Sequence, residues 1–297
     1  MIDLHTHSNA SDGNLSPSVL VEEASKRAIS VLALTDHDNI QGLEEASRAA
    51  RERGILFVPG IEFEINWKED APGEFHLLGL GINKPSPGFI AAVEDMFQRR
   101  EKRNLEMVKK MNSEGISFSY DDVKAFAGGD SVFRPSVGRP HFAALLVKRK
   151  IVKNTDQAFK RYLGKGKPYY IPRIGLEFEK ALEVIHESGG IALIAHPMSL
   201  YVAWGRLTDL IKNLKERGLD GLEAWHPAAK TSACQRLKEL GEKLGLYVSA
   251  GSDFHGENIP ARKLGFTGGG KKITESLFDE AFLETIRFLA SRPLDLK

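Results

Sequence analysis

The amino-acid sequence predicts an α/β barrel that is interrupted by a helical insertion. Short apolar runs alternate with segments of helical periodicity, which is the pattern of repeated βα units. Residues of the kinds that bind metals follow most of these runs, as expected where the carboxyl ends of barrel strands meet. A chain of 297 residues, 42% of them hydrophobic, is long enough for one such domain with an insertion.

Seven segments have the composition of short buried strands. The run from Val31 to Thr35 is almost wholly apolar, as in a parallel strand that is buried on both faces. The expected strands lie near residues 1–4, 31–35, 55–61, 75–80, 191–195, 221–225 and 247–250.

Helical patterns follow or separate these strands. Ser16 and Pro17 provide an N-cap and a first-turn proline for the first helix, and Gly54 ends the second. The expected barrel helices lie at 16–27, 40–53, 177–187, 207–216, 231–244 and 277–289.

The strand pattern stops after residue 80, and residues 85–170 are predicted to form a helical insertion. Helical segments are expected near 87–115, 121–127, 139–150 and 156–163, with Gly and Pro residues between them. The barrel would then consist of residues 1–84 and 171–297.

Composition excludes several classes of protein. The 41 Lys and Arg residues nearly balance 40 Asp and Glu residues, so the formal charge of +1 is not that of a protein that coats long nucleic acid. The single cysteine, Cys234, rules out a disulfide within the chain. No apolar run is long enough to span a membrane and no secretion signal precedes the first strand, so a cytoplasmic location without membrane contact is expected.

The first strand runs into a metal-ligand pattern. Because side chains alternate along a strand, His5 and His7 project from the same face while Thr6 points away. Asp12 adds an oxygen ligand from the following turn, which suits a mixed nitrogen and oxygen site. A pair of half-buried structural histidines is the alternative for the isolated motif.

The positions of the other histidines favour the metal site. Seven of the nine histidines lie on or just after predicted strands, which would bring them to one rim of the barrel. They are His5, His7, His37, His76, His196, His226 and His255. Histidines placed only for packing would not follow this order.

A set of short motifs resembles a known family. They are His5-Thr-His-Ser-Asn-Ala-Ser-Asp-Gly13, Thr35-Asp-His-Asp38, Gly60-Ile-Glu62, His76-Leu-Leu-Gly79, Ala195-His-Pro197 and Gly251-Ser-Asp-Phe-His255. In this order they resemble the motifs of the polymerase and histidinol phosphatase (PHP) superfamily. The resemblance covers about residues 1–82 and 172–256, and Gly138-Arg-Pro-His-Phe-Ala143 is similar to an insertion motif of its stand-alone phosphoesterase branch.

The resemblance implies a distorted (β/α)7 barrel with two or three divalent ions at the strand ends. It implies three ligand sets: His5, His7, Glu62 and Asp253; Glu62, His76 and His196; and Asp12, His37 and His255. Glu62 would bridge two ions. Asp12, His37, His196 and Asp253 are the expected catalytic residues, whereas His226 is not assigned as a ligand.

The ligand types define the chemistry. Imidazole and carboxylate groups without thiolate favour Mn²⁺, Zn²⁺ or Fe²⁺. Ions that share a carboxylate can hold an anionic oxygen and lower the pKa of a water toward about 7. Phosphoester and amide hydrolysis both use this machinery, so the ligands alone leave the two classes open, and the resemblance favours phosphoesters.

The resembling branch suggests a small phosphorylated substrate. The leading expectation is removal of the 3′-phosphate from nucleoside 3′,5′-bisphosphates, followed by 5′ to 3′ exonucleolytic action on short 5′-phosphorylated RNA. The alternatives are a histidinol-phosphate-type phosphatase, a metal-dependent amidohydrolase and a non-catalytic metal-stabilised binding module.

The insertion contains candidate substrate-binding residues. Arg99 and Arg103 are one helical turn apart and share a face, for which a solvated charged surface is the ordinary explanation. His141 has a similar alternative as a capping residue. In the resembling branch the insertion covers the metals and its basic residues hold a second phosphate, so Arg99, Arg103 and His141 are expected to bind substrate.

Overall fold

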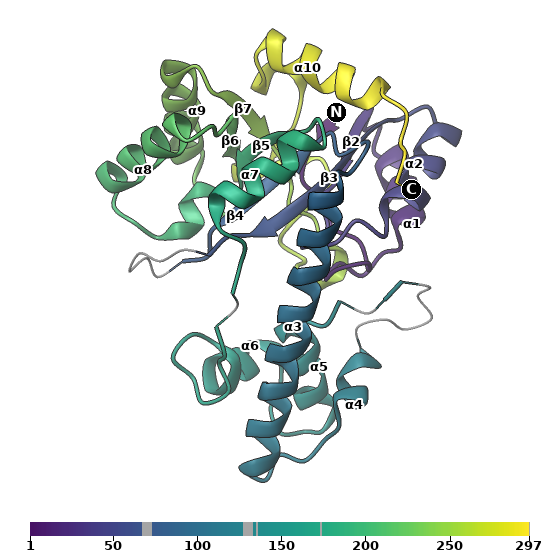
Figure 1. The fold of residues 1–297 in the computed structure, drawn as a ribbon, viewed down its shortest axis with the longest axis vertical. Coiled ribbons are helices and arrows are strands. Elements are labelled where there is room, and N and C mark those ends of the chain that lie inside the picture. Colours follow the sequence, from purple (N-terminus) through teal and green to yellow (C-terminus); the bar gives the residue numbers. More distant parts are fainter. Residues whose placement is uncertain (67–72, 127–132, 135, 173, 297) are drawn as a thin grey trace.

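Seven strands form one sheet whose spatial order, β1 to β7, follows the order of the chain (Figure 1). The structure, a computed structural model, describes residues 1–66, 73–126, 133–134, 136–172 and 174–296. The strands are β1 (Ile2–Asp3), β2 (Val31–Leu34), β3 (Leu56–Glu64), β4 (His76–Leu80), β5 (Ile191–Ile194), β6 (Gly221–Trp225) and β7 (Tyr247–Ala250). All seven lie where the sequence predicts them.

The first and last strands come together and nearly close the sheet into a barrel. The backbone N–H of Leu4 donates to the carbonyl of Ala250 over 3.3 Å, and Thr6 forms a parallel bridge with Phe254. The α/β barrel predicted from the sequence is confirmed in this respect. Closure matters for function because it brings the ends of β1 and β7 to the same part of the rim.

One strand runs against the prediction of an all-parallel sheet. β4 pairs antiparallel with both β3 and β5, through contacts such as Glu64 with His76 and Leu78 with Leu193. No helix is found between β3 and β4 in the described part of residues 65–75, and a parallel pair needs a crossover of about a dozen residues or more. The short connection therefore reverses the strand, and the amino end of β4 lies at the rim where the other strands end.

Helices cover the outside of the barrel (Figure 1). Ser16 caps the first of them by accepting from the N–H of Val19, and Pro17 occupies its first turn, as predicted. The barrel helices are α1 (Pro17–Lys26), α2 (Leu43–Glu52), α7 (Phe178–Glu187), α8 (Trp204–Glu216), α9 (Thr231–Leu244) and α10 (Glu280–Ser291). A short hairpin of β8 (Phe266–Thr267) and β9 (Lys271–Lys272) precedes α10.

A separate lobe of helices extends from one side of the barrel (Figure 1). Its elements are α3 (Pro87–Ser113), α4 (Tyr120–Lys124), α5 (Arg139–Lys148), α6 (Thr155–Ala158) and a short π-helical turn (Phe159–Leu163). The end of the expected helix at 121–127 lies partly outside the described residues. This lobe has its own hydrophobic cluster, which includes Met107, Phe142 and Leu163.

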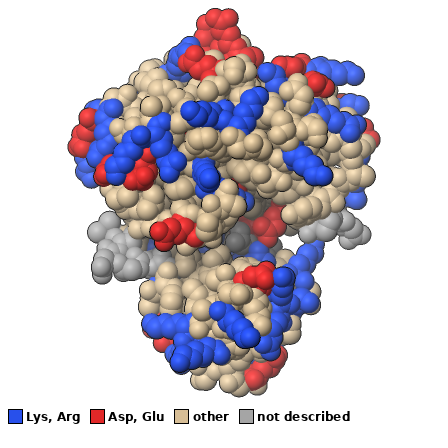
Figure 2. Space-filling model, turned by 180° about the vertical axis from the view of Figure 1, so that it is seen from behind, with Lys and Arg blue, Asp and Glu red and all other residues tan. Residues whose placement is uncertain are grey.

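The long helix α3 belongs to both parts of the molecule. Phe89 and Met96 near its start pack into the barrel core, whereas Met107 and Met111 pack into the lobe. Figure 2 shows a hollow between the barrel and the lobe. No helix in the described ranges combines the length and apolar character needed to cross a bilayer.

Candidate metal centre

All nine predicted metal ligands lie together at one rim of the barrel. His5 and His7 follow β1, His37 follows β2, and Glu62 is on β3. His76 begins β4, so the reversal of that strand is what places its imidazole at this rim. The remaining members come after β1, β5 and β7 and are Asp12, His196, Asp253 and His255.

Glu62 is the centre of the cluster. Its Oε2 lies 3.0 Å from Nδ1 of His37, 3.3 Å from Nε2 of His7 and 3.4 Å from Nε2 of His5. Its Oε1 lies 3.0 Å from Nδ1 of His76 and 2.9 Å from Nε2 of His196. The two oxygens of one buried carboxylate therefore face two different groups of imidazoles.

The closest groupings differ in part from the three sets that the resemblance implies. Within the described ranges, potential ligand atoms lie within 4.8 Å of one another in four groups. These are His7, Asp12, His37 and His255; His5, His196 and Asp253; His5, His7 and Glu62; and His37, Glu62 and His76. Glu62 belongs to two groups, so it can share its carboxylate between two ions.

The donor set fits divalent cations. Among the described residues, His7 Nδ1 and His76 Nε2 are buried without a hydrogen-bond partner, and His37 Nδ1 and Glu62 Oε2, although 3.0 Å apart, do not meet in hydrogen-bonding geometry and have no other hydrogen-bond partner. Burying polar atoms in this way is unfavourable unless another partner satisfies them. A set of imidazoles and carboxylates without thiolate meets the preference of Mn²⁺, Zn²⁺ or Fe²⁺.

Protons and metal ions would compete for these atoms. Burial lowers the pKa of His7, but its contacts with Asp253 and Glu62 outweigh this effect and raise the pKa to about 10. The same balance raises the pKa of His76 to about 9, with Glu62 as the main charge partner. Burial prevails for His37, whose pKa lies well below its usual value. Metal binding would replace protons at such sites.

Three residues outside the predicted set hold the ligands in place. Glu223 on β6 accepts from Nδ1 of His5 over 3.0 Å and from the backbone N–H of His196 over 2.8 Å. Nε2 of His226 donates to Oδ2 of Asp253 over 2.9 Å, because its Nδ1 already accepts from the backbone of Ala228. The third residue is Arg262, which pairs with Asp253.

Arg262 contacts Asp253 through both the side chain and the backbone of that residue. Its guanidinium is 2.5 Å from Oδ2 of Asp253 and 3.2 Å from the carbonyl oxygen of the same residue. Oδ1 of Asp253 points toward Nε2 of His7, 3.2 Å away. Asp253 is thus oriented by a cation and by His226 on one oxygen, which leaves the other for the cluster.

Asp36 fixes the loop that carries Asp12. Its two carboxylate oxygens accept from the backbone N–H and the hydroxyl of Ser8 and from the hydroxyl of Ser11. Burial raises the pKa of Asp36, while these hydrogen bonds oppose the rise. The Asp36 of the Thr35-Asp-His-Asp38 motif therefore positions a neighbouring loop.

The three candidate substrate-binding residues differ in their surroundings. Arg99 is on the surface of α3, where it pairs with Asp95 over 2.6 Å and donates to the carbonyl of Gly175 over 2.9 Å. Arg103 is buried and donates to Oδ1 of Asn104. Nδ1 of His141 accepts the backbone N–H of Gly138 over 2.8 Å and so caps α5, which is the alternative role given for this residue, and burial lowers its pKa.

A residue between the two predicted arginines reaches the barrel. Arg100 is buried and forms an ion pair with Asp38, which follows β2. Arg139 at the start of α5 makes a second link, 2.6 Å from Oε1 of Glu74. These ion pairs hold the lobe over the rim.

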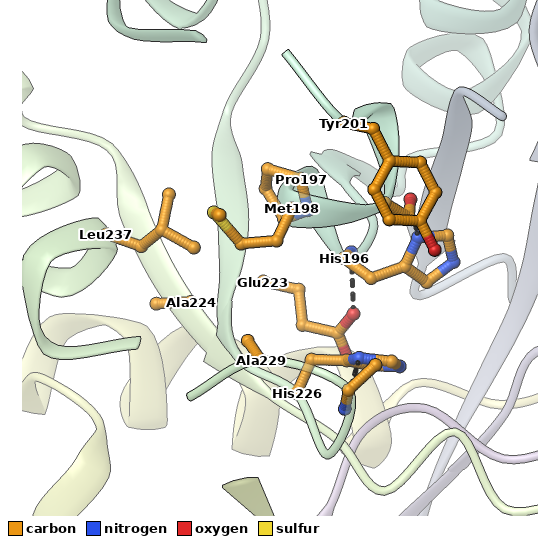
Figure 3. Close-up of a pocket in the computed structure, with 11 residues that line it drawn as sticks. His196, Pro197, Met198, Tyr201, Glu223, Ala224, His226, Ala229 and Leu237 are labelled. Carbon is orange, nitrogen blue, oxygen red and sulfur yellow. Dashed lines mark hydrogen bonds between the residues drawn. The ribbon is translucent and has the colours of Figure 1, made fainter. Parts of the chain in front are cut away.

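A pocket opens beside the cluster (Figure 3). His196 and His226 line one side of it, and Met198, Ala224 and Leu237 form an apolar wall. The backbone of His196 contacts Glu223 at the edge of this pocket (Figure 3).

The comparison with known proteins agrees with this arrangement. The PHP domain family matches residues 3–137, which include six of the nine predicted ligands. A 5′-3′ exoribonuclease from Haemophilus influenzae is 40% identical over 253 residues, which are 85% of this chain and 89% of the relative. The chain belongs to the PHP family.

Two further matches cover almost the full length of this chain of the PHP family. A 3′,5′-nucleoside bisphosphate phosphatase from Chromobacterium violaceum is 34% identical over 286 residues, 96% of this chain and 98% of the relative. A solved structure from the same organism, described as an amidohydrolase with bound sulfate and no metal, has a TM-score of 0.82 and 32% identity and covers 96% of each chain. The chain is a metal-dependent phosphoesterase of the PHP family.

Proposed function

We propose that this phosphoesterase removes the 3′-phosphate from nucleoside 3′,5′-bisphosphates and also acts on short 5′-phosphorylated RNA from its 5′ end. The observation that carries the proposal is the buried Glu62 carboxylate, each oxygen of which faces a different set of imidazoles beneath a basic lobe. The relative from Haemophilus influenzae is named a 5′-3′ exoribonuclease, and the relative from Chromobacterium violaceum is named a 3′,5′-nucleoside bisphosphate phosphatase.

The nine residues at the rim are proposed to hold two or three divalent ions, Mn²⁺, Zn²⁺ or Fe²⁺. Ions in such a cluster activate water and neutralise charge on a phosphoryl group. The protein holds the ligands rigidly, because they are buried and oriented by Glu223, His226 and Arg262.

Four ligands are proposed to act directly in catalysis: Asp12, His37, His196 and Asp253. The Asp12 side chain is 20% exposed whereas that of Glu62 is 1% exposed, so Asp12 lies on the side that a substrate reaches first. His196 lies at the edge of the pocket in Figure 3, where a leaving group can be accommodated.

Arg99, Arg103 and His141 are proposed to bind the phosphate that is not cleaved. His141 lies in the first turn of α5, and the neighbouring Arg139 ties this turn to Glu74 of the barrel over 2.6 Å, which supports a place for His141 near the rim. Binding a remote phosphate would hold the scissile ester over the cluster and so increase the rate. Arg is suited to this task because its guanidinium binds phosphate oxygens in pairs.

The test is phosphate release from a panel of substrates by metal-reconstituted protein. We expect a nucleoside 3′,5′-bisphosphate to be hydrolysed with a higher kcat/KM than histidinol phosphate or an aryl phosphate, and activity to disappear with a chelator. Hydrolysis of histidinol phosphate at the higher rate would contradict the proposal, as would binding of every substrate without turnover.

Amide hydrolysis is the second candidate, because the solved structure with 32% identity is described as an amidohydrolase. The same metal chemistry serves both reactions. N-acyl and cyclic amides belong in the panel, and release of an amine without release of phosphate would favour this alternative.

A further inference from the structure

The near-neutral net charge of the chain conceals a strong separation of charge. Residues 85–170 contain 17 Lys and Arg against 9 Asp and Glu, a formal charge of +8, whereas the rest of the chain has 24 against 31, a charge of −7. Divalent ions at the rim would offset the charge of the barrel. The lobe therefore has an excess of positive charge that the metal centre does not explain.

Most of this excess lies in one exposed stretch of the lobe. Between residues 148 and 167 the chain has eight Lys and Arg residues, all at exposed positions, and a single acidic residue, Asp156. We call residues 148–167 the basic segment. Lys and Arg side chains cover much of the visible face of the lobe in Figure 2.

The ion pairs of the basic segment do not cancel its positive electrostatic field. Lys160 lies 2.8 Å from Asp156, and Arg149 lies 3.4 Å from Asp122. Exposed pairs of this kind contribute little free energy, so either cation can exchange its partner for a phosphate.

Helix α5 connects the basic segment to the metal centre. Its first turn contains Arg139, whose guanidinium lies 2.6 Å from Oε1 of Glu74 on the barrel. Its last residue is Lys148, where the basic segment begins. Ten helical residues span about 15 Å, which is farther than a mononucleotide at the metal centre can reach but within the reach of several linked nucleotides.

Aromatic rings lie among these cations. Tyr162 stacks on Tyr169 with ring centroids 5.6 Å apart, and the guanidinium of Arg161 lies 5.0 Å from the Tyr162 ring. Arg139 lies 5.3 Å from the ring of Tyr170. Tyr169 is buried in the lobe, but Tyr162 and Tyr170 are partly exposed, each beside a guanidinium. Positive charge next to exposed ring surface is the pattern of single-strand binding surfaces.

We propose that the basic segment binds the downstream phosphates of a single-stranded RNA whose 5′ end lies at the metal centre. The inference rests on the proposed function and extends its RNA-directed part, because it names the surface that binds the RNA beyond its 5′ end. A mononucleotide would use only the residues near the rim.

The experiment compares two triple variants in which the same charge is lost. Lys150→Gln, Lys153→Gln and Lys167→Gln neutralise the basic segment, and Lys84→Gln, Lys212→Gln and Lys243→Gln are the control at exposed sites of the barrel. Affinity for a short 5′-phosphorylated RNA with a 3′ fluorophore is measured by anisotropy, with a chelator present so that no cleavage occurs, over a range of salt concentrations.

In the basic-segment variant we expect affinity to fall on the order of 10-fold at low salt and the slope of log K against log salt to become shallower by about 2, since each lost phosphate contact contributes about 0.7. The control should bind like the wild type. All three proteins should hydrolyse a nucleoside bisphosphate with the same kcat/KM and unfold at the same temperature.

Unchanged RNA affinity in the basic-segment variant, or an equal loss in the control, would overturn the inference while leaving the proposed function intact. Conversely, a wild type that binds RNA through these lysines but does not hydrolyse the bisphosphate would uphold the binding surface and refute the proposed mononucleotide activity.

Discussion

Oε1 of Glu223 lies 3.0 Å from Nδ1 of His5, and neither side chain is exposed. Because Nδ1 donates to this carboxylate, Nε2 of His5, which faces Glu62 and Asp253, is the ring atom left to bind a metal ion. The other oxygen of Glu223 accepts the backbone N–H of His196. One buried carboxylate therefore orients two of the proposed ligands.

Replacing Glu223 with Gln should weaken metal binding by about 10- to 100-fold, as is usual when the hydrogen-bond partner of a ligand histidine is removed. The size of the side chain is kept, so the barrel should remain folded. Competition with a chromogenic chelator measures the affinity, and Glu242→Gln on the exposed face of α9 is the control. Equal affinities in the two variants would show that His5 does not depend on Glu223.

The purified protein, reconstituted with Mn²⁺ or Zn²⁺, should bind more than one equivalent of metal. Nine clustered ligand residues exceed the four to six that a single ion takes. Elemental analysis after removal of free metal gives the ratio. One equivalent or less would contradict a cluster in which Glu62 is shared.

Asp253→Asn or His196→Asn should lower kcat far more than it raises KM, because each loses interactions that stabilise the transition state. Steady-state kinetics on a nucleoside bisphosphate, with metal content and thermal unfolding measured in parallel, separates this effect from misfolding. A metal-replete, fully active Asp253 variant would mean that the cluster is centred elsewhere.

Arg99→Ala or Arg103→Ala should reduce kcat/KM by about 1.5 to 3 kcal/mol, but only for substrates with a second phosphate. Lys102→Ala, at an exposed position of the same helix, is the matched control. Activity on an aryl phosphate at the same salt concentration monitors the metal centre. Equal losses on both substrates would indicate a folding or metal defect. Arg103 is buried, so its replacement is the one of the two that can disturb folding.

The stability contributed by His186 should depend on pH. Its hydrogen bond with Asp220, 2.7 Å long, raises the pKa of His186 above 6.5 in the folded state. The stabilisation is therefore fully present below the unfolded pKa of 6.5 and is lost as pH rises through the folded value. His186→Gln should lower the melting temperature at about pH 5.5 and have little effect at about pH 9. A difference that does not vary with pH would contradict this.

The sequence was sufficient for the strands and for the ligand types, because both are local patterns. Apolar runs mark buried strands, and histidines directly after them indicate a rim. The direction of β4 was not inferred from the sequence, although His76 lies at the start of its apolar run and not after it, as expected for a strand that begins at this rim. The direction of β4 depends on the connection that precedes it. The connection formed by residues 65–75 is too short for a parallel crossover.

Residues that act through other residues were harder to find. Glu223 appears in the sequence as one carboxylate within an apolar strand, which is a signal of a buried charge with a partner, but nothing local identifies His5 as that partner. Arg262 lies in a loop, where an arginine is unremarkable. Both are recognised only when distant segments are brought together.

The orientation of α3 also could not be predicted. Arg99 and Arg103 share a face by spacing, yet Arg99 is 37% exposed at its side chain while Arg100 and Arg103 are buried. Helical periodicity specifies which residues are neighbours on the surface of a helix, but not which side faces the cleft. That side is decided by the ion pair between Arg100 and Asp38 and by the packing of Phe89 and Met96.

The two separate hydrophobic clusters have a consequence for how such a protein can diversify. Side chains such as Phe142 and Leu163 stabilise the lobe without contributing to the barrel cluster, which contains Leu78 and Leu193 next to the ligands. Substitutions in the lobe can therefore accumulate under selection for a new substrate while the geometry of the nine rim residues is inherited unchanged.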